Sequence, residues 1–123
     1  MNALAVFIGG GLGSLCRWGI ALCLVPYKTS FPHATLIANI LSCILIGYLL
    51  ALGMKSNLSD PYKSLLVVGF CGGFSTFSTF SKETYLLFKN GDSGLAIMNI
   101  LGSVALCLAA IYLGIQLARW LHS

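Results

Sequence analysis

The residues whose types and spacing favour chemistry gather in one glycine- and hydroxyl-rich segment. Gly72 and Gly73 precede a run, from residue 74 to 81, that contains only Phe, Ser and Thr. Such a run makes a poor continuous helix, because glycine and hydroxyl residues favour other backbone conformations. The flanking sequence is apolar, which places the segment at membrane depth, where released carbonyl groups bind cations and helix N-termini face anions. We predict a helix break near Gly72 to Ser75; the alternative is a glycine kink packed against a neighbouring helix.

Phenylalanines recur every third residue in this run, at Phe74, Phe77 and Phe80. Residues three apart share a helix face, so we expect Phe77 and Phe80 to lie along one stripe. Such a stripe ordinarily faces lipid or the protein core. Because the edge of an aromatic ring is electropositive, a ring edge turned into a pore would also contact a small anion without offering it a full charge.

Polar side chains occur at four-residue spacing in two other apolar stretches, as Thr35 with Asn39 and as Asn99 with Ser103. Such groups are unfavourable against lipid and therefore face the interior of a helix bundle. There they either join helices or donate hydrogen bonds to a passing ion. Arg17 is a charge inside the first apolar stretch, and it either extends to the membrane surface or lines an aqueous vestibule that attracts anions.

Other kinds of chemistry lack the residues that they need. Glu83 is the only glutamate, and the sequence contains no paired carboxylates, no Ser-His-Asp set and no histidines at metal-binding spacing, so we expect no enzyme activity. The basic residues are scattered singly, which speaks against a nucleic-acid partner. The five cysteines lie within apolar stretches, and we expect them to pack as small hydrophobic side chains instead of forming disulfides.

Four apolar stretches are long enough to position these residues across a lipid bilayer. Of the 123 residues, 58% are hydrophobic and 8% are charged, whereas soluble domains carry roughly 25% charged residues. The stretches cover residues 3–25, 34–54, 60–88 and 94–120, and about 20 helical residues cross a bilayer core. We expect Asp60 to cap the third helix and Pro61 to lie in its first turn. The sequence thus predicts an all-α membrane protein, one four-helix domain over residues 1–123 whose third helix is broken at the midplane.

The first stretch has no Lys or Arg ahead of it, so we expect a span of the mature protein and not a cleavable signal peptide. Gly9 and Gly13 in this stretch have the G-x-x-x-G spacing that favours close helix packing. Four helices hardly enclose a water-lined path by themselves, which favours an oligomer.

The positive charges give little bias to the orientation of the chain. The side with both termini holds Lys55, Lys63 and Arg119, and the other side holds Lys28, Lys89 and, at the end of the third stretch, Lys82. The chain is therefore expected either to insert both ways and pair as an antiparallel dimer, or to follow a small imbalance in charge.

At these residues the sequence resembles the Fluc family of fluoride channels, also called CrcB proteins. The similarity covers essentially the whole chain. It includes Arg17-Trp18, Ala38-Asn39 with Gly47, and Asn99 with Gly102-Ser103, and its most specific part is the segment from residue 69 to 81.

The resemblance implies a dual-topology homodimer with two antiparallel pores, through which fluoride leaves the cytoplasm passively across the bacterial inner membrane. It implies that the pore is lined by Asn39, Phe77 and Phe80, with a hydroxyl track at Ser78, Thr79, Thr35 and Ser103. It also implies a structural sodium ion at the dimer centre, bound by the backbone carbonyls of Gly72 and Ser75. The family usually has threonine where Ser75 stands, a change that matters little when the backbone is the ligand.

Two alternatives remain at this stage. A small dual-topology multidrug exporter has a similar size, but it depends on a glutamate in its first span, where this chain has only Arg17. A non-transporting membrane assembly subunit would have no need of a helix break at the midplane.

Overall fold

The structure, a computed structural model, describes residues 2–27, 29–55 and 59–123, and within these ranges it contains helices and no strand. The helices are α1 (Asn2–Cys23), η1 (Val25–Tyr27), α2 (His33–Lys55), α3 (Asp60–Lys63), η2 (Ser64–Cys71), α4 (Gly72–Phe74), α5 (Phe77–Lys89) and α6 (Ser93–Leu121). Four of the resulting segments are long and apolar enough to cross a membrane: α1, α2, the stretch Asp60–Lys89, and α6. The predicted all-helical architecture with four candidate spans is confirmed. Lys28, one of the charges counted for orientation, lies outside the described residues, as does the side chain of Lys55.

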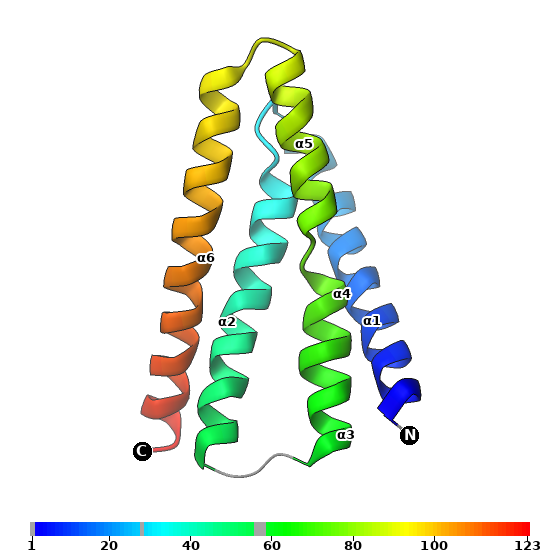
Figure 1. Cartoon of the computed structure of the whole chain (residues 1–123), viewed down its shortest axis with the longest axis vertical. Helices are drawn as coiled ribbons and strands as arrows, with labels where there is room; N and C mark the ends of the chain where they lie inside the picture. The colour runs from blue at the N-terminus through cyan, green and yellow to red at the C-terminus, as the bar shows by residue number, and fades with distance from the viewer. Residues whose placement is uncertain (1, 28, 56–58) are drawn as a thin grey trace.

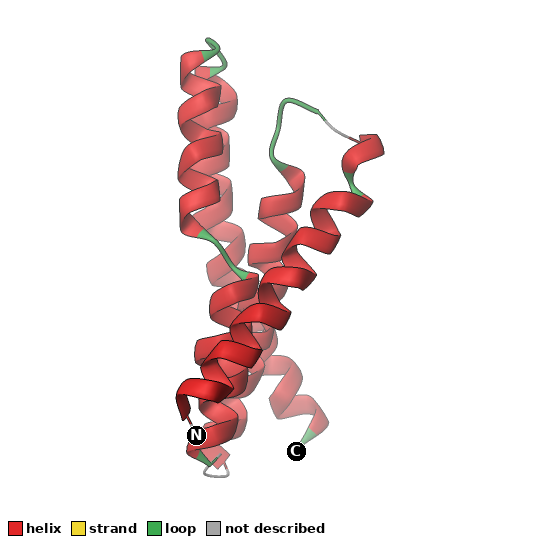
Figure 2. Ribbon diagram, turned by 90° about the vertical axis from the view of Figure 1, so that its right-hand side faces the viewer, coloured by secondary structure: helices red, strands yellow, loops and turns green. Residues whose placement is uncertain are grey.

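The third span packs against two different helices: its first half contacts α1 and its second half contacts α6 (Figure 1). α2 and α6 run side by side in the same direction and make the most extensive contact in the chain, while α1 packs along η2 and α4. α5 continues the third span along α6. Both termini lie at the same end of the bundle. Figure 2 shows that the C-terminal end of α1 diverges from the pair formed by α5 and α6.

Glycines allow the closest helix contacts, as the G-x-x-x-G spacing predicts. Gly9 and Gly13 are buried where α1 meets η2. A Cβ atom at Gly13 would overlap the carbonyl oxygen of Phe70, and one at Gly73 would overlap the carbonyl oxygen of Gly10. α2 and α6 approach in the same way, since a Cβ at Gly47 would overlap the carbonyl oxygen of Ile111.

The third span begins one residue earlier than the sequence predicts. Ser59 is the N-cap residue, with φ −62° and ψ 152°, and Asp60 is the first helical residue, so the prediction of Asp60 as the cap is wrong. Pro61 lies in the first turn as expected, where its missing N–H leaves no hydrogen bond unmade. Asp60 is still favourable there, because a carboxylate stabilises the positive end of the helix dipole. The span then widens into the π-helical η2, which the sequence did not predict.

Between α4 and α5 the helical backbone is interrupted at Ser75 and Thr76 (Figure 1). Ser75 has φ −80° and ψ 158°, and Thr76 has φ −151° and ψ 127°, so both are extended. Gly72 and Gly73 are helical, so of the predicted range near Gly72 to Ser75 only Ser75 lies in the interruption, which continues to Thr76. Gly73 lies within an intact helix, where the absence of a Cβ lets α1 pack closely. The extended conformation of Ser75 and Thr76 is held instead by side-chain hydrogen bonds.

Candidate functional site

Asn39 of α2 holds the interruption through two hydrogen bonds to one residue. The backbone N–H of Thr76 donates to Asn39 Oδ1 at 2.8 Å, and Asn39 Nδ2 donates to the carbonyl oxygen of Thr76 at 3.2 Å. The side chain thus replaces the helical partners that an extended residue loses. These two bonds use the amide oxygen and one N–H of Asn39, and the amide nitrogen carries one further N–H.

Local side chains complete the interruption on both sides. Thr76 is the N-cap of α5, and its Oγ1 accepts a hydrogen bond from the backbone N–H of Thr79 at 3.2 Å. On the other side, the Ser75 and Ser42 hydroxyls donate to the carbonyl oxygen of Cys71 at 2.8 and 3.1 Å. Hydroxyl residues favour such caps over helix interiors, so this segment forms a defined break.

The same hydrogen bonds redirect two amides away from the carbonyl groups of Gly72 and Ser75. In a continuous helix the N–H of Thr76 would bind the carbonyl of Gly72, and the N–H of Thr79 would bind that of Ser75. Here these amides donate to Asn39 and to the Thr76 hydroxyl instead. Carbonyl oxygens are suitable ligands for a hard cation such as sodium. The backbone of Gly72 and Ser75 therefore fits the carbonyl role that the resemblance implies.

Beside the interruption lies a groove of about 250 Å³ between α2, α5 and α6. It is lined by Asn39, Cys43, Ser75, Thr76, Phe77, Phe80, Ser103, Val104 and Cys107. Phe77 and Phe80 form a ring pair with centroids 5.6 Å apart and planes inclined by 40°, so the predicted stripe is confirmed. Phe74 lies on the other side of the break and pairs with Phe70. The Phe77 side chain is 78% exposed in the single chain.

The structure brings four of the predicted pore residues, Asn39, Phe77, Phe80 and Ser103, to this groove and places three others elsewhere. Ser78 and Thr79 lie in the first turn of α5, where Ser78 Oγ is 3.3 Å from Thr76 Oγ1. Thr35 is buried and donates its hydroxyl to Glu83 Oε1 at 2.8 Å. These three residues do not line the groove.

Asn99 joins helices and is not available to the groove. Its side chain is 1% exposed, its Nδ2 donates to Thr84 Oγ1 at 2.9 Å, and its Oδ1 accepts from Ser103 Oγ at 3.2 Å. Thr84 in turn donates to the carbonyl oxygen of Phe80 at 2.8 Å. Thr84 was not predicted from the sequence, although a threonine within an apolar stretch is a polar group that needs a partner. This chain of hydrogen bonds ties α6 to the helix that carries both groove phenylalanines.

Arg17 makes a contact that neither predicted alternative included. Its Nε donates to the carbonyl oxygen of Gly73 at 3.2 Å, in a partly buried position two residues before the interruption. An arginine has five N–H donors, so further donors remain for other groups. The contact links the charge on α1 directly to the end of α4.

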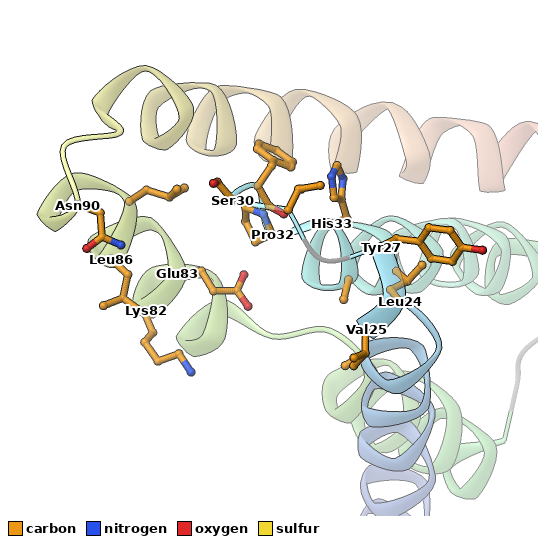
Figure 3. Close-up of a pocket in the computed structure, with 15 residues that line it drawn as sticks. Leu24, Val25, Tyr27, Ser30, Pro32, His33, Lys82, Glu83, Leu86 and Asn90 are labelled. Carbon is orange, nitrogen blue, oxygen red and sulfur yellow. The ribbon is translucent and has the colours of Figure 1, made fainter.

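A second, larger hollow of about 630 Å³ lies between the connection that follows α1 and the outer half of α5 (Figure 3). Glu83 and Lys82 extend toward it from α5, and His33 and Tyr27 border its other side. Glu83 Oε2 is buried and has no hydrogen-bond partner among the described residues. Glu83 was not predicted from the sequence as a residue of the site. The indication available was its position as the sole glutamate, inside an apolar stretch where ionisable groups are rare and usually functional.

Four candidate spans with an aromatic-lined groove that contains a few polar side chains beside a helix interruption define a multi-pass membrane protein of the channel or transporter class. The family described as "CrcB-like protein, Camphor Resistance (CrcB)" matches residues 4–115, and the chain belongs to this family. Two relatives carry the name "Fluoride-specific ion channel FluC". The one from Shewanella oneidensis is 42% identical, and the one from Shewanella baltica (strain OS155) is 41% identical, each over 117 residues that cover 94% of both chains.

Proposed function

We propose that this protein is a fluoride-selective ion channel of the bacterial inner membrane, through which fluoride leaves the cytoplasm passively. The observation that carries the proposal is the similarity, over 94% of the chain, to relatives named as fluoride-specific ion channels. Neither the small exporter nor the assembly subunit has support of this kind. An inside-negative potential drives an anion outward with about 2.3 kcal/mol per charge for each 100 mV, so no other energy source is required.

In this proposal the groove beside the interruption forms part of the fluoride path. The edges of the Phe77 and Phe80 rings offer the ion a weak positive potential, and the second N–H of the Asn39 amide offers a hydrogen bond. The Ser103 hydroxyl would offer another by turning its single O–H from Asn99 Oδ1 toward the ion. The arrangement supports the role because these four side chains line one groove although they come from three helices. Ser78, Thr79 and Thr35 extend the path as a hydroxyl track beyond the groove.

The working unit in this proposal is an antiparallel, dual-topology homodimer. The groove is open along one side of the single chain, and Phe77 is 78% exposed there. A second copy packed against this face would cover the ring and close the path. The nearly balanced positive charges on the two sides of the membrane support insertion in both orientations.

We further propose a structural sodium ion at the dimer centre, bound by the carbonyl oxygens of Gly72 and Ser75 from each chain. The redirected amides of Thr76 and Thr79 support this, since they leave both carbonyls without their usual helical partners. When bound, the ion would supply a fixed positive charge near the fluoride path. Arg17, held at the carbonyl of Gly73, would add a second positive charge and attract anions from an aqueous vestibule.

The test is fluoride efflux from liposomes that contain the purified protein. Vesicles loaded with potassium fluoride are diluted into fluoride-free solution, valinomycin is added to carry the counter-ion, and a fluoride electrode records release. We expect rapid fluoride release, and matched vesicles loaded with chloride should release almost none. Release no faster than from protein-free vesicles, or equal release of both anions, would contradict the proposal.

A further inference from the structure

Polar and small residues form two matching ladders where α2 and α6 run side by side. The steps on α2 are Thr35, Asn39, Cys43 and Gly47, and those on α6 are Asn99, Ser103 and Cys107, followed one turn later by the apolar Ile111. Both ladders advance by four residues, or about one turn, and the two helices run in the same direction (Figure 1). Gly47 fixes the register, because its Cα lies directly against the backbone of Ile111. One turn before that contact, this register places Cys43 opposite Cys107.

The two cysteines lie together as the register requires. Cys43 and Cys107 are neighbours across the contact between α2 and α6 and line the same groove. Both are partly exposed, and both line the groove that also contains Phe77 and Phe80. The pair is therefore accessible from the groove, and it is held by the two helices that make the most extensive contact among the described residues.

The geometry points to a two-coordinate site for a soft metal ion, such as monovalent copper or silver or divalent mercury, between the sulfur atoms of Cys43 and Cys107. Thiolates are the ligands that such ions prefer. The described residues provide no group of three or more His, Cys, Asp and Glu side chains that could hold a metal ion, which disfavours the four-coordinate sites typical of zinc. Ions that accept two opposed sulfur ligands fit a pair better than ions that need four.

Binding at this site is an exchange of protons for metal, with no oxidation or reduction. Each thiol releases its proton to water, two sulfur–metal bonds form, and the ion loses its labile water ligands. The other cysteines do not offer the same arrangement. Cys16 and Cys23 lie seven residues apart on α1, about 10 Å along the helix. Cys71 is also a neighbour of Cys43, but it is fully buried and does not line the groove.

An ion held by Cys43 and Cys107 would occupy the groove beside the phenylalanine pair. With a monovalent ion the two thiolates leave a net negative charge, which repels an anion, and any such ion takes up space in the groove. Closure of the fluoride path by the metal rests on the proposed function, whereas the binding site itself does not. The two are therefore measured separately.

The binding experiment uses Hg²⁺ as the probe and the full-length Cys16→Ser/Cys23→Ser protein as the parent. Mercury–thiolate absorption in the ultraviolet measures binding, and intact mass measures the loss of two protons for each ion gained. We expect one ion per chain in the parent, bound about 100-fold more tightly than in Cys43→Ser or Cys107→Ser, because the second sulfur binds intramolecularly. The control Cys71→Ser should keep the affinity of the parent.

Unchanged affinity in either single-cysteine variant, or two ions bound independently per chain in the parent, would overturn the site. Size-exclusion chromatography identifies any variant that has not folded, and the variant at the partner cysteine then decides the question. In liposomes, one equivalent of Hg²⁺ should lower fluoride efflux at least ~10-fold in the parent and by clearly less in Cys43→Ser. Tight binding without any fluoride efflux from the metal-free parent would contradict the channel function and uphold the site.

Discussion

Asn39 is the side chain through which the second span controls the interrupted third span. Its amide accepts from the N–H of Thr76 and donates to the carbonyl of the same residue. Asparagine satisfies both requirements, whereas an ionised aspartate offers only acceptors. The residue thus has a positioning role in addition to the proposed contact with fluoride.

Asn39→Asp should lower fluoride efflux at least ~10-fold while the protein stays folded and of native size. The substitution removes the donor to the Thr76 carbonyl, a loss of about 1 kcal/mol, and places a negative charge in the groove that repels an anion. Liposome efflux and size-exclusion chromatography measure the two effects. Asn39→Ala separates them, since it removes the hydrogen bonds without adding charge. Efflux at the wild-type rate in Asn39→Asp would remove Asn39 from the path.

Thr84→Val should lower thermal stability in detergent by the equivalent of about 1–2 kcal/mol. Valine keeps the shape of threonine but leaves the buried amide of Asn99 without its acceptor. The exposed Ser81→Ala serves as the control on the same helix and should leave the melting temperature unchanged. Equal melting temperatures for Thr84→Val and Ser81→Ala would show that this network contributes nothing to stability.

At the scale of the helices, the sequence predicted the number and approximate limits of the spans because length and hydropathy determine them. It predicted the pairing of Phe77 with Phe80 because a three-residue spacing within one helix fixes that contact. The position of the break could not be predicted in the same way. It depends on Asn39, 37 residues away from Thr76, and on glycines that pack against another helix. Local propensity shows that a segment is a weak helix, but tertiary contacts select the residue at which it ends.

The sequence likewise predicted only some residues of the candidate site. Asn39, Phe77, Phe80 and Ser103 share a groove as expected, because polar and aromatic groups in apolar spans turn toward the bundle. Thr84 and Glu83 were missed as site residues, since their partners lie on other helices and no local pattern marks them.

Gly13→Ala should destabilise the protein by about 1–3 kcal/mol, as overpacking commonly does. An added Cβ would overlap the carbonyl oxygen of Phe70 and force α1 away from the third span. Gly11→Ala is the matched control, because no atom lies within 4 Å of a Cβ at that position of the same helix. Thermal unfolding in detergent compares the two. Equal stability of both variants would mean that the α1 contact with the third span tolerates separation.

At the scale of the whole molecule, both termini lie at one end of the bundle, so each copy has a single, definable orientation in the membrane (Figure 1). The numbers of positive charges at the two ends are nearly equal, so they favour neither orientation strongly. An antiparallel pair would contain one chain in each orientation.

Cysteine labelling in cells tests this topology. In a chain whose native cysteines are replaced by serine, Ser123→Cys should react with a membrane-impermeant maleimide in about half of the molecules before permeabilisation and in the rest after it. Ser93→Cys, at the opposite end of α6, should give the same result. Opposite and complete labelling patterns at the two positions would establish one orientation and contradict dual topology.

The central claim is that fluoride passes the rings of Phe77 and Phe80, and replacing either with isoleucine tests it most directly. Isoleucine keeps the apolar character but removes the electropositive ring edge, and swaps that conserve volume usually lower stability by less than ~1.5 kcal/mol. Methionine should retain more activity than isoleucine, because its flexible, polarisable chain adapts to an irregular path. Each variant is examined by liposome fluoride efflux and by size-exclusion chromatography. The account predicts folded Phe77→Ile and Phe80→Ile proteins of wild-type size with efflux at least ~10-fold lower, and wild-type efflux from both would contradict it.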